Sequence, residues 1–443
     1  MSDSKMTDEQ IMDTRKRHML PTVNHYYRKP MHITKAQMQW VWDSEGKQYL
    51  DALGGIVTIS AGHNHPRIKK RLMNWMEEDK PQHTTVLYLS EPVAELALKT
   101  AKIAPQGLNR SFFTNSGSEA NELAILLSRQ YTKRHEIVAL KHAYHGGTAG
   151  TLSLVGQKNW KWGGPSLPGV VHAAQPNCYR CPWGATPDSC ALECAKDVEE
   201  TIVSSTSGEI AAMIVEPIQG VGGFIVPPKE YFPKIQEIVK KYGGIYISDE
   251  VQSGVGRTGQ YWFGVLHNGI VPDMITMAKG FGNGASIGGL ITRDEIAESA
   301  RGKTHFNTFG GNPWQTIQAA ETLSILQEEN VLDKCTKLGD MILAGLREVQ
   351  KGSKIMGDVR GRGLMIGIEM VKDRTTKAYG TEECLEVMEQ TRERGLLVGK
   401  GGMYGNVVRL TPPMCIDEKN VQNIVRIFGE AVQATEKLMG YAR

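Results

Sequence analysis

The stretch Gly244-Ile-Tyr-Ile-Ser-Asp249 shows the pattern on which the fold prediction rests: a short, mostly apolar run stops at a charged side chain. Three further stretches repeat this pattern at a polar or charged residue: Arg110 to Thr114 before Asn115, Ile210 to Val215 before Glu216, and Met274 to Ala278 before Lys279. Runs that are apolar on both faces are typical of strands buried in a sheet that helices cover. We therefore predict that these four stretches are strands of one central sheet.

Segments with a helical pattern lie between these strands, at about 118–133, 191–206, 229–241 and 312–328. Alternation of strands and helices predicts an α/β fold with a mainly parallel, doubly wound sheet and helices on both faces. Trp40 to Leu50 is typical of a β-hairpin, and after about residue 330 the pattern becomes helix–strand–strand–helix, with 361–370 as a strand. We predict a large domain over 76–330 and a smaller α+β domain built from 331–443 and joined by the N-terminal segment 1–75.

The residues at the strand ends are the first candidates for a functional site. Ligands of parallel α/β sheets bind beyond the carboxyl ends of the strands, so Glu216, Asp249 and Lys279 are expected to converge. A partly buried lysine loses its charge easily and becomes a nucleophile that can form an imine with an aldehyde cofactor. Asp249 could pair with a pyridinium nitrogen. The alternatives are an ordinary strand-end lysine and a carboxylate that caps a turn.

Five other residues fit the binding of a flat, phosphorylated ring. Gly117 lets the backbone approach a ligand, and Ser118 is expected to cap a helix whose free N–H groups would bind phosphate. Tyr144 could stack on the ring or simply be a core tyrosine. Val251 could pack on a ring face and Gln252 could hydrogen-bond a ring oxygen.

Together these motifs resemble those of the class III pyridoxal-phosphate-dependent aminotransferases of fold type I. The resemblance covers about residues 20–440 and is nearest to the alanine–glyoxylate aminotransferase 2-like, ω-amino acid–pyruvate subgroup. The matching stretches are Asp51 to Gly55, Gly62 to Pro66, Asn115 to Asn121, Tyr144-His-Gly146, Glu216 to Gly220, Asp249 to Gln252, the Lys279 segment, Thr308 to Pro313, Gly361 to Met365 and Arg409 to Pro413.

The resemblance implies pyridoxal 5'-phosphate as cofactor and a role for each matching residue. Lys279 would be the Schiff-base lysine and Asp249 the partner of the pyridinium nitrogen. Thr308 would reach the phosphate of a neighbouring subunit's cofactor, which implies an obligate homodimer with shared active sites and leaves a tetramer open. The other cofactor-binding residues would be Gly117 and Ser118 at the phosphate, Tyr144 and Val251 on the ring, Gln252 at the ring oxygen, and Glu216.

The implied activity is transfer of an amino group by a ping-pong mechanism. Arg409 matches the arginine that binds the substrate carboxylate in this family. In relatives that act on ornithine or 4-aminobutyrate a glutamate pairs with this arginine, but the corresponding residue here is Val221. We therefore expect a small keto acid (pyruvate, glyoxylate or 2-oxoglutarate) as acceptor. The expected donors are alanine, β-alanine, 3-aminoisobutyrate or a taurine-like ω-amine, with Ile56 and Val57 as candidate pocket residues.

Two alternatives stay open at this point. A phospho-lyase, decarboxylase or aminomutase could use the same fold and cofactor. Cys178, Cys181, Cys190 and Cys194 have a spacing that zinc sites also use, so a zinc-binding interaction module is a remote alternative. We expect free cysteines in a loop and no metal.

Composition excludes several other classes of protein. The chain has 443 residues and a net charge of only +3, without a concentrated basic patch, so we expect no nucleic-acid partner. It has no run of 18 apolar residues, so we expect no membrane partner. Seven cysteines in a long chain, and acidic residues among the first twenty, lead us to expect a cytoplasmic protein.

Overall fold

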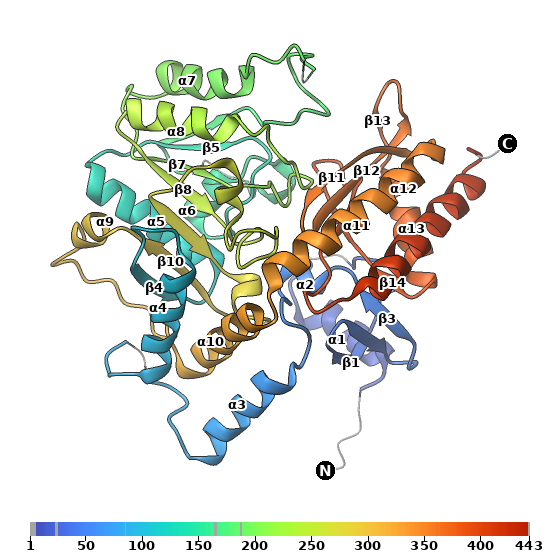
Figure 1. Ribbon diagram of the computed structural model, residues 1–443, viewed down its shortest axis with the longest axis horizontal. Coiled ribbons are helices and arrows are strands. Elements are labelled where there is room, and N and C mark those ends of the chain that lie inside the picture. The colour runs from blue at the N-terminus through green and yellow to red at the C-terminus, as the bar shows by residue number, and fades with distance from the viewer. Residues whose placement is uncertain (1–5, 23–24, 85, 164–165, 187, 442–443) are drawn as a thin grey trace.

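A central seven-stranded sheet organises the computed structural model, which describes residues 6–22, 25–84, 86–163, 166–186 and 188–441 (Figure 1). Strands β9, β8, β7, β5 and β6 pair in parallel, whereas β10 runs antiparallel to both β9 and β4. The predicted mainly parallel sheet is therefore confirmed. Its order is β4 (Arg110–Thr114), β10 (Gly288–Thr292), β9 (Met274–Met277), β8 (Ile245–Asp249), β7 (Ala212–Val215), β5 (Ile137–Leu140) and β6 (Val170–Ala173).

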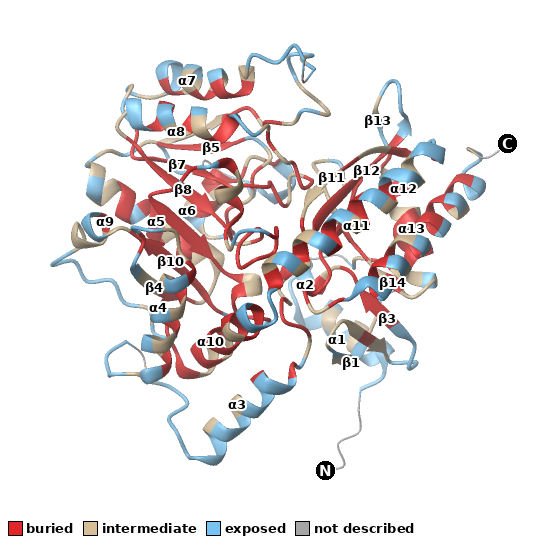
Figure 2. Cartoon of the chain, viewed as in Figure 1, coloured by how far each residue is buried: buried red, intermediate tan, exposed pale blue. Residues whose placement is uncertain are grey.

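Helices cover both faces of this sheet, and the alternation of side chains along each strand explains how. In β8, Ile245 and Ile247 belong to the same buried cluster as Leu123 of a helix on one face. Tyr246 belongs to the second cluster, together with Val239 of a helix on the other face. All five residues of β8 are buried, which is why the strand reads as a nearly continuous apolar run (Figure 2).

The predicted helices begin and end within two residues of the observed ones. The helices of this part of the chain are α5 (Gly117–Thr132), α6 (Ala149–Leu154), α7 (Glu193–Ser205), α8 (Tyr231–Lys241), α9 (Asp294–Glu298) and α10 (Pro313–Glu328). Three-residue and five-residue 3₁₀ turns lie at Lys158–Trp160 and Gly264–Asn268.

A second sheet of five strands is formed by the C-terminal part of the chain. Its order is β11 (Met356–Arg362), β12 (Met365–Asp373), β16 (Val407–Leu410) and β15 (Gly399–Gly401), and β13 (Ala378–Tyr379) pairs with β12. The accompanying helices are α11 (Val331–Gly352), α12 (Thr381–Glu393) and α13 (Glu418–Leu438).

The prediction of one strand over 361–370 was wrong. That segment turns back on itself, because Arg362 of β11 pairs with Met365 of β12 across a two-residue turn. Gly363 in this turn has φ +53°, a conformation that glycine adopts without strain.

A third sheet joins the two ends of the chain. The predicted hairpin is confirmed as β2 (Trp40–Asp43) and β3 (Gln48–Asp51), next to β1 (Ile33–Gln37). Strand β14 (Leu396–Leu397) adds to β3 in parallel, so the blue and red ends of the ribbon meet (Figure 1). The remaining helices of the N-terminal part are α1 (Asp8–His18), α2 (Gly54–Val57), α3 (Pro66–Glu77) and α4 (Glu91–Ile103).

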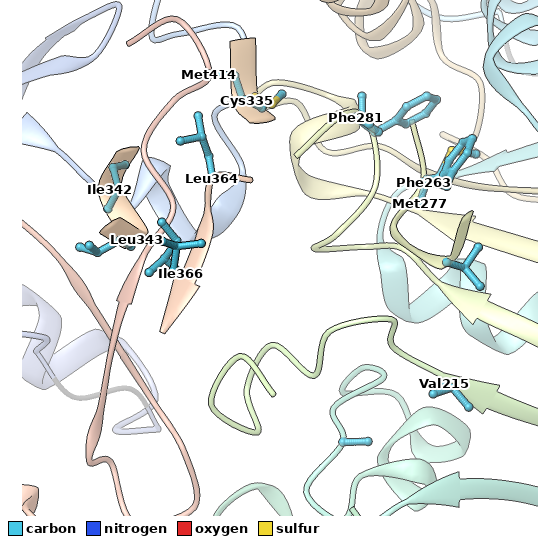
Figure 3. Packing of buried hydrophobic residues seen from close by; sticks show 14 of the residues in the cluster. Val215, Phe263, Met277, Phe281, Cys335, Ile342, Leu343, Leu364, Ile366 and Met414 are labelled. Carbon is cyan, nitrogen blue, oxygen red and sulfur yellow. The ribbon is translucent and has the colours of Figure 1, made fainter. Parts of the chain in front are cut away.

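One continuous cluster of buried hydrophobic side chains connects the central sheet to the C-terminal elements. It runs from Val215 and Met277 at the strand ends through Phe281 to Leu364 and Ile366 (Figure 3). This shared core holds the loops of the central sheet against the C-terminal sheet. In the part of the chain that the structure describes, no helix has the length and apolar character needed to cross a membrane.

Candidate active site

The carboxyl ends of β7, β8 and β9 meet at one cavity of about 110 Å³, as expected for a parallel sheet. Eight of the ten predicted site residues line it; Thr308 and Arg409 are not among the lining residues. The lining residues are Gly117, Ser118, Asn121, Tyr144, His145, Gly146, Glu216, Asp249, Val251, Gln252, Ala278 and Lys279.

Lys279 opens a short 3₁₀ turn, η3 (Lys279–Phe281), directly beyond β9. Its φ of +50° is unusual for a side chain with a Cβ and marks a strained position. Part of the residue is accessible through the cavity, yet burial lowers the pKa of its amine, against the opposing effect of Asp249 and Glu216. A lysine in this state supplies the neutral amine that nucleophilic catalysis requires.

Asp249, the last residue of β8, is held by three hydrogen bonds. Its Oδ2 accepts from Asn121 Nδ2 at 2.8 Å and lies 2.7 Å from His145 Nδ1, and its Oδ1 accepts from the Val251 N–H at 3.1 Å. Burial works to lower the pKa of His145, but the hydrogen bond to Asp249 and the negative charges of Asp249 and Glu216 together outweigh it, and the pKa is raised. This carboxylate is therefore fixed in place and paired with a cationic or readily protonated imidazole.

Asn121 and His145 also belong to the site, although neither was predicted from the sequence. Both lie inside stretches that carried the resemblance, Asn115 to Asn121 and Tyr144 to Gly146. Their spacing to Asp249 is 128 and 104 residues, so only the closure of the sheet brings them together.

Glu216, beyond β7, holds the loop that carries Tyr144. Its Oε1 accepts from the Tyr144 N–H at 3.0 Å and its Oε2 from the Gly220 N–H at 2.8 Å. Burial raises the pKa of Glu216, and the nearby Asp249 raises it further, although His145 opposes the change. Tyr144 in turn meets the edge of Trp160, with ring centroids 4.8 Å apart.

The start of α5 forms one end of the cavity, and the prediction that Ser118 caps this helix was wrong. The helix begins one residue earlier than expected, so Ser116 is the N-cap and its hydroxyl accepts from the Glu119 N–H at 3.2 Å. Ser118 Oγ instead accepts from the Gly147 N–H at 3.1 Å. A Cβ on Gly117 would lie 2.9 Å from Val251, so this position requires glycine for close packing.

Three polar atoms of the cavity wall are buried without a hydrogen-bond partner among the described residues: Asn121 Oδ1, His145 Nε2 and Gln252 Oε1. Buried polar atoms are seldom left unpaired, so they point to a bound polar group. The residues present also include a free helix N-terminus at Gly117 and a buried carboxylate at Asp249. This set fits a phosphorylated pyridine of the kind that pyridoxal 5'-phosphate provides.

Arg409 lies on β16 of the C-terminal sheet, outside the residues that line the cavity, and is 4 % exposed. Its Nη2 donates to the Tyr26 hydroxyl at 3.2 Å, while its Nε and Nη1 are buried without a partner in the described part of the chain. Its charge contributes to lowering the pKa of Lys279, which places it near the amine. A guanidinium with two unpartnered nitrogens suits the binding of a carboxylate. No signal in the sequence pointed to Tyr26.

The remaining predicted residues lie outside the cavity wall. Thr308 is exposed in the loop between α9 and α10. Ile56 is 52 % exposed, whereas Val57 is buried. The Val221 carbonyl accepts from the Gly402 N–H at 2.9 Å, so the residue in place of the glutamate of some relatives is fixed against the C-terminal sheet.

The four clustered cysteines line a separate cavity of about 660 Å³ and are free thiols. Within the described ranges, no three His, Cys, Asp or Glu side chains are grouped so that they could hold a metal ion. The structure therefore gives no support to the zinc alternative.

The comparison with known families identifies the class of protein. A model of the class-III aminotransferase family matches residues 22–432, so this chain belongs to that family of fold type I, pyridoxal-phosphate-dependent enzymes. It is an aminotransferase, which takes an amino donor and a keto-acid acceptor.

Three individual proteins show what the chain is similar to within this family. The chain is 40 % identical over 415 residues to alanine–glyoxylate aminotransferase 2 homolog 2, mitochondrial, of Arabidopsis thaliana, covering 94 % of this chain and 85 % of that one. It is 37 % identical to the human mitochondrial alanine–glyoxylate aminotransferase 2, covering 95 % and 86 %. The solved ω-transaminase of Pseudomonas jessenii in complex with PMP has a TM-score of 0.90 and 29 % identity, covering 98 % and 99 %.

Proposed function

We propose that this aminotransferase moves an amino group from a small amino acid or ω-amine to a small keto acid. The donors are alanine, β-alanine, 3-aminoisobutyrate or a taurine-like amine, and the acceptor is pyruvate, glyoxylate or 2-oxoglutarate. The observation that carries the proposal is the buried Arg409 guanidinium, of which two nitrogens have no partner among the described residues. Where some relatives have a glutamate that pairs with this arginine, the chain has Val221, so we expect the arginine to be available to every carboxylate that enters.

Each residue of the cavity has a role in this proposal that follows from its contacts. Pyridoxal 5'-phosphate, when bound, supplies an electron sink for the charge that develops on the substrate carbon. Asp249, oriented by Asn121 and His145, holds the ring nitrogen protonated. Lys279 is the amine that binds the cofactor and moves the proton at the substrate carbon.

The other residues bind and orient. Gly117 and Ser118 hold the phosphate at the start of α5, where free N–H groups and the helix dipole favour an anion. Tyr144 and Val251 pack on the ring and Gln252 donates to or accepts from its oxygen. Glu216 acts through Tyr144, because it accepts from the N–H of that residue. The donor's product leaves before the keto acid binds, as a ping-pong mechanism requires.

The proposal includes a homodimer in which Thr308 reaches the partner's phosphate site. Supporting this, Thr308 lies in an exposed loop between Phe306, 47 % exposed, and Phe309, 58 % exposed. Tyr88 and Leu89, 71 % and 104 % exposed, add large apolar side chains to the surface. The rings of His83 and Phe309 lie 5.4 Å apart, so the two segments adjoin, and a contiguous exposed apolar patch is typical of an interface.

We also propose the domain boundaries 1–75, 76–330 and 331–443. The pairing of β14 with β3 supports assigning both ends of the chain to one smaller domain. The cytoplasmic location stays a prediction, because the two relatives described above are mitochondrial by name.

A matrix of amine donors against keto acids tests the function. We expect turnover with β-alanine or alanine as donor and pyruvate or glyoxylate as acceptor, followed as consumption of the keto acid. A strict requirement for 2-oxoglutarate would contradict the specificity. Turnover of an amine without any keto acid would favour the lyase, decarboxylase or aminomutase alternatives.

A further inference from the structure

Two arginines lie in one row across the C-terminal sheet. Arg360 of β11 is directly opposite Gly367 of β12, and Gly367 is directly opposite Arg409 of β16. Directly opposed residues point to the same face of a sheet. A Cβ on Gly367 would lie 3.0 Å from the Cβ of Phe224, so Phe224 occupies the space between the two arginines.

A buried carboxylate lies on the same face, one step along β12. Glu369 follows Gly367 by two residues, so it shares the face, and its side chain is 3 % exposed. It is diagonal to both arginines, at about 7–8 Å in a regular sheet, which is within reach of long side chains. The register alone therefore allows Glu369 to pair with either arginine.

Glu369 forms ion pairs with two other cations. Its Oε2 lies 2.8 Å from Arg360 Nη1, and its Oε1 pairs with Arg180 Nε. Arg180 is held by the ring of Tyr379, 4.0 Å from its guanidinium carbon. No ion pair joins Glu369 to Arg409 in the described structure, although both are buried.

Arg360 is in turn fully engaged. Its Nε and Nη2 donate to the Gly223 carbonyl at 3.1 and 2.7 Å, and its Nη1 also lies 2.7 Å from Asp358 Oδ2. The cluster of Arg180, Arg360, Asp358 and Glu369 thus balances two positive with two negative charges. Loss of the Arg360 charge would leave an excess carboxylate in a buried place, which is costly unless another cation pairs with it.

We propose that Arg360 and Arg180 are positioning residues that withhold Glu369 from Arg409 and so keep the substrate-carboxylate site open. Without Arg360, Glu369 turns along the diagonal to Arg409 and competes with the substrate carboxylate. The inference rests on the proposed role of Arg409. Substrate specificity then depends on the charge of Arg360, a residue that does not contact the substrate.

The test is an Arg360→Gln variant, because glutamine loses the charge but can still donate to the Gly223 carbonyl. Propionate, a carboxylate without a keto group, serves as the probe, and its Kd is measured by calorimetry. We expect its affinity for Arg360→Gln to fall by about tenfold or more, which corresponds to about 1.4 kcal/mol. The KM for pyruvate should rise in parallel, while the KM for an amine without a carboxylate stays unchanged.

The decisive measurement is rescue by a second substitution. In Arg360→Gln/Glu369→Gln the competing carboxylate is gone, so propionate affinity should recover to within about threefold of the parent. If Arg360 served packing alone, the double variant should lose further propionate affinity. Arg374→Gln is the matched control, since Arg374 lies beyond β12 and donates to the Gln350 and Ser353 carbonyls.

The remaining outcomes would refute either this inference or the proposed function. Unchanged propionate binding by folded Arg360→Gln, or a loss that the double variant does not reverse, would refute the inference. If Arg360→Gln does not fold, Arg180→Gln with and without Glu369→Gln repeats the test. Propionate binding that survives Arg409→Gln would place the carboxylate elsewhere. A parent enzyme that binds propionate through Arg409 but transfers no amino group would refute the proposed function and leave this inference standing.

Discussion

The two walls of the active site differ in how completely their charged groups are held. On the side of the central sheet, Asp249 has three hydrogen-bond partners and Glu216 has two. On the side of the C-terminal sheet, Arg409 has one, the Tyr26 hydroxyl. In the proposed function, the groups that keep one geometry through every turnover are fixed by the fold, whereas Arg409 is left to be satisfied by the substrate. We therefore expect the first wall to determine the reaction and the second the choice of substrate.

Among the substitutions in the first wall, Lys279→Ala should reduce catalysis the most. Without the amine, neither the bond to the cofactor nor the proton transfer can occur, so turnover should be lost together with the absorbance near ~400 nm that the lysine-bound cofactor gives. Absorbance and steady-state rates measure this, with the exposed Lys303→Ala as control. Normal rates in Lys279→Ala would refute the assignment.

Asp249→Asn should lower kcat/KM by at least about 100-fold, because an amide cannot stabilise a positive ring nitrogen as a carboxylate does. Since His145 orients Asp249, His145→Asn should cause a smaller loss. Steady-state kinetics of both variants rank the two effects. A larger loss in His145→Asn than in Asp249→Asn would reverse the roles given to these residues.

Arg409→Lys tests the second wall. Lysine keeps the charge but not the planar fork of donors, so the KM for pyruvate should rise about tenfold or more, while an amine without a carboxylate reacts as before. Measuring the half-reaction with pyruvate and the half-reaction with the amine separately distinguishes an effect on carboxylate binding from an effect on both substrates. An equal loss for both substrates would mean that Arg409 supports the fold or the cofactor rather than substrate choice.

Glu250, next to Asp249 but outside both walls, should affect stability and leave substrate choice untouched. Burial raises the pKa of Glu250 to about 7, although the Ser253 hydroxyl and two backbone N–H groups oppose this. A carboxyl whose pKa is raised on folding adds stability that is complete below its unfolded pKa and is lost as pH rises through about 7.

Denaturant unfolding of the cofactor-free protein between pH 4.5 and 8 measures this effect, which should amount to about 3 kcal/mol across the range. Glu250→Gln cannot titrate, so its stability should vary less with pH. A slope equal to that of the parent would show that folding does not raise the pKa of Glu250.

The strand-end residues could be predicted because one rule, that parallel strands end at one edge of a sheet, places Glu216, Asp249 and Lys279 together. The cap of α5 was misassigned because Ser116 and Ser118 both suit an N-cap, and a shift of one residue decides between them. The turn at Gly363 was missed because it interrupts a stretch, 361–370, whose residues are otherwise typical of a single strand.

The partners of these residues depend on contacts that local sequence does not encode. His145 and Asn121 meet Asp249 only through the order of the strands. Glu369 faces Arg409 only through the register of β12 and β16, which no spacing in the chain reveals.

The joining of the chain's two ends has a consequence for how the enzyme is made. Strand β3 finds its partner β14 only after some 345 further residues have been synthesised, and the contact of Tyr26 with Arg409 spans 383 positions. At the pace of translation this is a delay of tens of seconds. The early hairpin must wait on the ribosome with an unpaired edge, so the surroundings of Arg409 are completed only after most of the chain has been synthesised.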